Sequence, residues 1–116
     1  MVGWRRRIEI KTPEQLAVMR AAGLVVAEAL RRTAEAARPG VTTARLDAIA
    51  AEVIADAGAT SSFLGYHGYP STICVSVNEE VVHGIPGPRE LREGDLVEFA
   101  VEQTEPAFRQ LRQVLL

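Results

Sequence analysis

The stretch GDLVEFAVEQTEPAF, residues 94–108, decides how the C-terminal part of the chain folds. After a Gly-Asp pair, apolar residues alternate with acidic or small ones: Val97, Phe99 and Val101 against Glu98, Ala100 and Glu102. Because successive side chains of a strand point to opposite faces, this alternation predicts a strand with its apolar face in the core. The opposite face is either a wall of an active site or a solvated polar surface.

The first half of the chain predicts two helices. Thr12 is placed to cap the first, with Gln15 completing a capping box, and its apolar residues recur at helical spacing until residues 38–40 stop it. Thr42 or Thr43 caps the second helix, which closes at Gly58. These apolar stripes are typical of helices that pack on a core.

The pattern then changes to alternation. Residues 73–77 predict a half-buried strand, and residues 81–83 predict a short return strand that ends at a loop rich in Gly and Pro. Two helices followed by antiparallel strands predict an α+β fold.

Residues 102–116 form a divergent tail. Its apolar residues recur every three or four positions, which predicts a short C-terminal amphipathic helix that covers part of the sheet; they are Phe108, Leu111, Val114 and Leu115. We expect a single incomplete domain over residues 1–116, with an N-terminal arm and edge strand over 1–11 and the main body over 12–101.

The composition, with 47% hydrophobic and 24% charged residues, is typical of a soluble globular protein. A net charge of −2 gives no reason to expect a nucleic-acid partner, and the basic residues 5–7 are interpreted as a solvated arm. The single cysteine, Cys74, excludes an internal disulfide and suits the reducing cytoplasm. The sequence has neither a signal peptide nor a run of about 20 apolar residues, so we expect no membrane association.

Two segments are candidates for chemistry. In LGYHGYP, residues 64–70, the aromatic rings of Tyr66 and Tyr69 either line a small pocket beside His67 or lie on a mobile surface loop. In VVHGIPG, residues 81–87, His83 is either a structural hydrogen-bonding group or a residue that donates to an oxyanion or shuttles a proton.

These segments carry a resemblance to a known family. Residues 8–97 resemble the N-terminal half of the bacterial type I methionine aminopeptidases through IEIKTPEQLAVMRAAG, RPGVTTARLDAIA, FLGYHGYPSTICVSVNEEVVHGIPG and LREGDLVEF. The resemblance implies the two-fold pita-bread fold and a cytoplasmic hydrolase that removes the N-terminal methionine of nascent chains. In full-length relatives, this reaction uses water activated by divalent ions such as Co, Mn, Fe or Zn.

The resemblance also assigns site residues. It implies that His83 is a catalytic residue that hydrogen-bonds the scissile peptide group of the substrate and stabilises the tetrahedral intermediate. It implies that the pocket for the methionine side chain is lined by Phe63, Tyr66, Tyr69 and Cys74, with His67 close by.

The sequence departs from the family at the metal site. Where the family has its first Asp ligand, this chain has Ala100, which carries no donor atom, and the remaining ligands of the family belong to the second half of the fold. Glu98 and Glu102 could bind a hard cation weakly, although the simpler interpretation is a solvated polar face. We therefore expect a truncated aminopeptidase that binds no metal and is inactive alone. The alternative is a non-catalytic interaction protein that self-associates through an exposed sheet edge.

Overall fold

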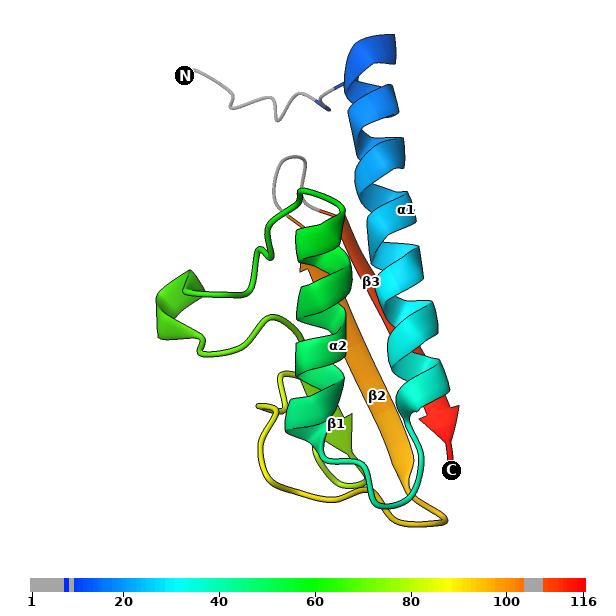
Figure 1. The fold of residues 1–116 in the computed structure, drawn as a ribbon. Coiled ribbons are helices and arrows are strands. Elements are labelled where there is room, and N and C mark those ends of the chain that lie inside the picture. Colours follow the sequence, from blue (N-terminus) through cyan, green and yellow to red (C-terminus); the bar gives the residue numbers. More distant parts are fainter. Residues whose placement is uncertain (1–7, 9, 104–107) are drawn as a thin grey trace.

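The computed structural model describes residues 8, 10–103 and 108–116, and the side chains of residues 102–114 lie outside this description. Two helices lie on one face of a three-stranded antiparallel sheet of order β1-β2-β3 (Figure 1). The elements are α1 (Pro13–Ala36), α2 (Thr43–Asp56), the short 3-10 helix η1 (Tyr66–Gly68), β1 (Cys74–Val77), β2 (Leu96–Gln103) and β3 (Phe108–Leu115). The α+β expectation is confirmed.

Local capping chemistry sets the ends of both helices. The Thr12 hydroxyl accepts from the Gln15 backbone N–H at 3.2 Å, and the Gln15 side chain accepts from the Thr12 N–H at 2.8 Å, which is the predicted capping box. Thr42 caps α2 by accepting from the Arg45 N–H at 3.1 Å. Gly58 follows α2 at φ +70°, a left-handed conformation that favours glycine.

The core lies between the helices and the sheet. The alternation predicted for β2 is confirmed, because Val97, Phe99 and Val101 are completely buried towards the helices. They pack with apolar residues of the other elements, which include Val26, Ala29 and Leu30 of α1, Leu46, Ala50, Val53 and Ile54 of α2, and Val75 and Val77 of β1.

Strand β1 is buried on both faces, whereas the sequence predicted a half-buried strand. Val75 and Val77 face the helices, and Cys74 and Ser76 on the other face are covered by neighbouring loops. Phe63 packs on Cys74, and the Gly84 N–H donates to the Ser76 hydroxyl. Loop segments therefore act as a partial third layer on the second face of the sheet.

The predicted return strand at residues 81–83 is wrong. Val82 and His83 have φ of +29° and +58°, which lie outside the extended region that a strand requires. The chain instead meets the edge of β1 at one point, where the Val75 N–H donates to the Gly84 carbonyl at 2.9 Å.

The predicted C-terminal helix is also wrong, because Phe108–Leu115 is strand β3, paired antiparallel to β2 along its length. An eight-residue helix has too few internal hydrogen bonds to be stable alone, whereas a strand beside β2 gains a full ladder. The tail therefore extends the sheet and does not cover its face as a helix.

The N-terminal arm shows no strand at the described residues Ile8, Ile10 and Lys11, and Ile8 and Ile10 are about nine-tenths exposed. The rest of the predicted edge strand, residues 1–7 and 9, lies outside the described residues. In the part of the chain that the structure describes, no helix has the length and apolar character needed to cross a membrane.

Phe99 should dominate the stability of this core. Phe99→Ala should lower the free energy of unfolding by about 3–5 kcal/mol, because it leaves a large cavity at the centre of β2. Leu96→Ala is the matched control on the same strand, since Leu96 is 43% exposed and its truncation should cost less than about 1 kcal/mol. Urea unfolding followed by circular dichroism measures both, and equal losses would contradict this account of the core.

Candidate functional site

The second face of the sheet carries the residues that the sequence singled out. Cys74 of β1 lies directly opposite Ala100 of β2 in the strand register. Phe63 packs on both, and these three side chains form a small buried cluster with the half-buried Tyr69 at its margin. The rings of Phe63 and Tyr69 are 6.0 Å apart and tilted by 59°, a favourable geometry for an aromatic pair. We call Phe63, Tyr69, Cys74 and Ala100 the pocket cluster.

Tyr69 joins two loops through its phenol group. Its hydroxyl lies 2.8 Å from the Ile73 carbonyl and 3.2 Å from the Gly84 carbonyl, so one O–H is shared between two acceptors. Burial, followed by the hydrogen bond with Cys74, raises the pKa of the Tyr69 phenol well above its ordinary value. The tyrosine is thus held as a neutral donor at the edge of the pocket cluster.

His83 lies at the rim of the cluster. Its Nδ1 is 3.8 Å from the Cys74 Sγ, and the imidazole is otherwise exposed to solvent. The neighbouring Gly84 fixes it, because the two backbone groups of Gly84 bond the amide of Val75 and the hydroxyl of Ser76. The structure therefore places the imidazole at the margin of the pocket cluster.

Tyr66 and His67 lie apart from the cluster. They sit in η1, on the excursion that projects from the body of the molecule (Figure 1). Both are exposed, and their rings pack edge to face with centroids 4.3 Å apart. The structure thus brings Phe63, Tyr69 and Cys74 together with His83, while Tyr66 and His67 contact each other.

Helix α2 anchors both loops that carry site residues. Asp47 accepts from the backbone N–H groups of Thr72 and Ile73, each at 2.9 Å, just before β1 begins. The Thr43 hydroxyl accepts from the Gly87 N–H at 2.8 Å and lies 3.1 Å from the Gly87 carbonyl, so it holds the loop that follows His83. These anchors were missed in the sequence, where Asp47 looks like any polar residue on a helix flank. The two adjacent threonines were the one sequence signal for these anchors. Thr42 caps the helix, so the hydroxyl of Thr43 is available to bond the loop at Gly87.

The pocket cluster does not fit a divalent metal ion. Ala100 offers a methyl group to the cluster, and Glu98 lies two positions before it along the same face of β2. The side chain of Glu102, the other expected carboxylate, lies outside the description. Within the described residues, no three His, Cys, Asp or Glu side chains gather closely enough to hold a metal ion. A hard divalent cation needs several oxygen ligands, which this cluster does not supply.

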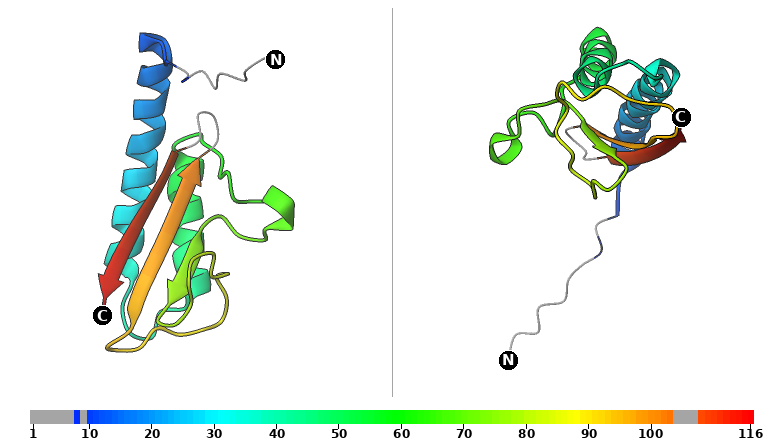
Figure 2. Two further views of the ribbon diagram at one scale, coloured as in Figure 1. Left: turned by 180° about the vertical axis from the view of Figure 1, so that it is seen from behind. Right: turned by 90° about the horizontal axis from the view of Figure 1, so that it is seen from below.

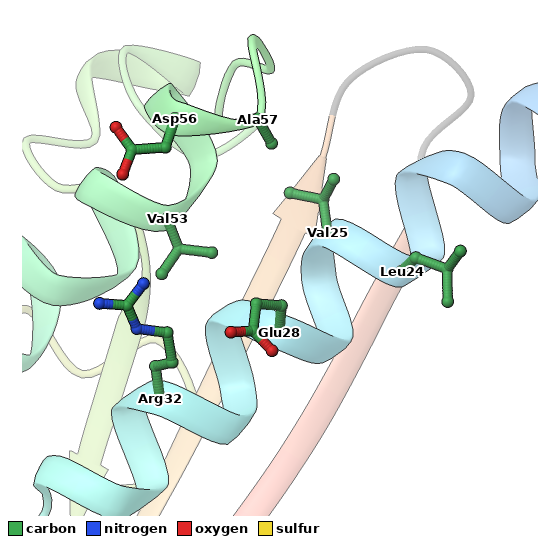
Figure 3. A pocket seen from close by; sticks show the side chains of 7 residues that line it. All are labelled: Leu24, Val25, Glu28, Arg32, Val53, Asp56 and Ala57. Atoms are coloured by element: carbon green, nitrogen blue, oxygen red, sulfur yellow. The ribbon is translucent and has the colours of Figure 1, made fainter.

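A concavity lies on the far side of the molecule, between the two helices (Figure 3). It is an open groove of about 340 Å³, lined by Leu24, Val25, Glu28, Arg32, Val53, Asp56 and Ala57. Its floor is apolar and its rim is charged, but none of the residues that the sequence singled out for chemistry lies in it.

Gly84 is the sharpest steric constraint at the site. A Cβ at this position would overlap the Val75 carbonyl oxygen, a backbone atom whose displacement would disturb β1. Gly84→Ala should therefore destabilise the protein by roughly 2 kcal/mol or more and shift the NMR signals of His83. Gly87→Ala is the control, because its nearest heavy atom lies 3.9 Å away and ordinary packing accommodates it. Similar melting curves for the two variants would contradict the close approach.

Tyr69 should remain protonated at pH values where an exposed tyrosine ionises. The chain has two tyrosines, so Tyr66→Phe leaves Tyr69 alone to report tyrosinate absorbance. We expect its ionisation midpoint above about pH 10, the ordinary value. Because the folded pKa exceeds the unfolded one, the stabilisation from Tyr69 is fully present below about pH 10 and is lost as pH rises through the folded pKa. A midpoint near the ordinary value in the folded protein would contradict the buried phenol.

Comparison with known proteins gives a consistent result. The sequence pattern of metallopeptidase family M24 matches residues 17–102. A methionine aminopeptidase from Mycobacterium tuberculosis is 54% identical over 94 residues, which are 80% of this chain and 35% of that protein. An uncharacterized protein from the adk 3′ region of Micrococcus luteus is 59% identical over 86 residues, 74% of this chain and the whole of that protein.

The fold agrees with these sequences. The crystal structure of a methionine aminopeptidase from Thermotoga maritima superposes with a TM-score of 0.90 at 34% identity, over 95% of this chain and 45% of that one. The expectation of a partial pita-bread fold is confirmed, and the chain spans well under two-thirds of the methionine aminopeptidases that it matches. The chain belongs to metallopeptidase family M24, and within that family it is similar to the methionine aminopeptidases.

Proposed function

We propose that this chain binds peptides with an N-terminal methionine in its pocket cluster but does not hydrolyse them by itself. Family membership supports the choice of ligand, since the similar proteins are methionine aminopeptidases. The apolar cluster of Phe63, Cys74 and Ala100, with the Tyr69 phenol and the His83 imidazole at its margin, supports an apolar side chain as the group that it contacts.

One observation carries the proposal. Ala100 stands opposite Cys74 at the position where the family resemblance expects the first Asp ligand. A metal-bound water is the nucleophile that the family resemblance implies, and a methyl group cannot help to hold the metal. The residues that the resemblance assigns to the methionine side chain and to the peptide group are present, whereas an Asp at position 100 is not.

The proposal gives each residue near the cluster a role. Phe63 and Cys74 form the floor of the pocket, and Tyr69 forms its edge. His83 donates a hydrogen bond to the carbonyl of the bound peptide bond, as the resemblance implies for its counterpart. The resemblance also assigns Tyr66 to the pocket and His67 to its surroundings, and both lie on the projecting excursion.

A second candidate function is a non-catalytic interaction protein. It is favoured by β3, whose outer edge carries no further strand among the described residues. Such an edge can pair with a strand of another chain. Size-exclusion chromatography separates the candidates, because the peptide-binding function does not require self-association.

The binding function is tested with a Met-Ala peptide and the intact chain. His83→Ala should weaken peptide binding roughly tenfold, because it removes one hydrogen bond to the peptide group. Val81→Ala is the matched control, since Val81 lies on the same loop and is 84% exposed. Calorimetry measures both affinities, and equal effects of the two substitutions would refute the assigned role of His83.

The absence of hydrolysis is tested in the same samples with added Mn²⁺ or Co²⁺. We expect no release of methionine and metal binding no tighter than about millimolar. Glu98→Ala should change that binding no more than Glu93→Ala, the control on an exposed turn. Turnover that a chelator abolishes, or tight binding lost only in Glu98→Ala, would refute the proposal.

A further inference from the structure

The backbone of Val82 and His83 is strained. Their φ angles are +29° and +58°, in a region that residues with a side chain rarely adopt. Val82 is the only β-branched residue with a positive φ in the part of the chain that the structure describes. A conformation of this kind persists only where surrounding contacts impose it, and such residues cluster at functional sites. The contacts that hold these two residues therefore bear on the role of His83.

These contacts converge on Gly84, the next residue in the chain. Its N–H donates to the Ser76 hydroxyl at 3.0 Å, and its carbonyl accepts from the Val75 N–H at 2.9 Å. The same carbonyl lies 3.2 Å from the Tyr69 hydroxyl, which comes from the loop that leads into β1. Figure 2 shows the two loops beside β1 and away from β3. Tyr69 therefore ties the segment that bears His83 to the loop that precedes β1.

Tyr69 is in turn connected to helix α2. Its hydroxyl lies 2.8 Å from the Ile73 carbonyl, and the Ile73 N–H donates to the Asp47 carboxylate at 2.9 Å. A path of hydrogen bonds thus runs from Asp47 through Ile73 and Tyr69 to Gly84, and we call these four residues the relay. Because hydrogen bonds to a charged acceptor are stronger than neutral ones, the carboxylate is the firm end of the relay.

We infer that Asp47 and Tyr69 are positioning residues that hold the His83 imidazole at the margin of the pocket cluster. The relay keeps Gly84 in place, so the two residues before it stay left-handed and the His83 Nδ1 stays 3.8 Å from the Cys74 Sγ. Without the Tyr69 O–H, this segment relaxes towards the extended backbone that β-branched residues favour, and the imidazole moves away. The consequence for peptide binding rests on the proposed function, whereas the position of the imidazole does not.

The first test removes the Tyr69 hydroxyl and keeps the ring, in Tyr69→Phe. The NMR cross-peak between the His83 imidazole and the Cys74 β-protons should weaken at least about threefold, and the affinity for a Met-Ala peptide should fall roughly fivefold, the loss expected for one hydrogen bond. Ser71→Ala is the matched control, since it removes a hydroxyl of the same loop that bonds no other described residue. Unchanged signals of Phe99 verify that the core is intact.

The second test interrupts the relay at Asp47. Asp47→Asn keeps an oxygen that can accept the Ile73 N–H and should weaken peptide binding less than about threefold, whereas Asp47→Ala should weaken it roughly tenfold. Asp56→Ala is the control for loss of a carboxylate from α2, because Asp56 is exposed. Each double variant with Tyr69→Phe should bind no worse than the weaker of its single variants, since both changes break one path. Circular dichroism verifies folding, and the asparagine series gives the comparison if Asp47→Ala unfolds.

Three results would overturn the inference: an unchanged cross-peak in Tyr69→Phe, an equal effect of Ser71→Ala, or losses that multiply in the double variants. The cross-peak reports on the imidazole without any peptide, so it decides the positioning role even if the intact chain binds no Met-Ala peptide. That failure of binding would refute the proposed function alone. Peptide binding together with an unchanged cross-peak would refute the positioning role and leave the proposed function in place.

Discussion

The carboxylate of Asp47 accepts two backbone N–H groups at the entrance to β1, and the arrangement of the site depends on this contact. Hydrogen bonds to a charged acceptor are stronger than neutral ones, and two of them fix the direction of the chain as well as its position. With Thr43 holding the loop near Gly87, a single helix sets the spacing between Tyr69 and His83. The core that stabilises α2 therefore also keeps the pocket in shape.

The two faces of strand β2 meet different requirements: one packs in the core, and the other carries the position that the resemblance gives to a metal ligand. One set of its residues, with Phe99 at the centre, is fixed by packing against the helices. Ala100 lies on the opposite face, against Cys74 and Phe63. An alanine there is compatible with the fold, while it removes an oxygen ligand from the position that the resemblance gives to a metal.

Sequence reasoning succeeded where the determining interactions are local. The cap at Thr12, the end of α2 at Gly58 and the alternation of β2 each depend on a few neighbouring residues. The predictions were wrong where hydrogen bonds to backbone groups distant in the sequence determine the local conformation. The conformation of residues 81–83 follows from the hydrogen bond between Gly84 and β1, which the short apolar pattern of this segment does not indicate. Residues 108–115 have helical spacing, but they form a strand because β2 supplies backbone hydrogen-bond partners along their length. The anchoring role of Asp47 depends on a partner 25 residues away, which no local pattern indicates.

Helix α1 begins at Pro13 but has no buried residue before Ala22, and this has a consequence for local dynamics. Amide protons near the N-terminus of α1 are held by capping and helical hydrogen bonds alone, whereas those beyond Ala22 are also shielded by the sheet. Opening of the first turns therefore requires no disruption of the core, and deuterium should enter them long before it enters the turn around Leu30. The helix is a single element in geometry, but its two ends differ in how readily they open.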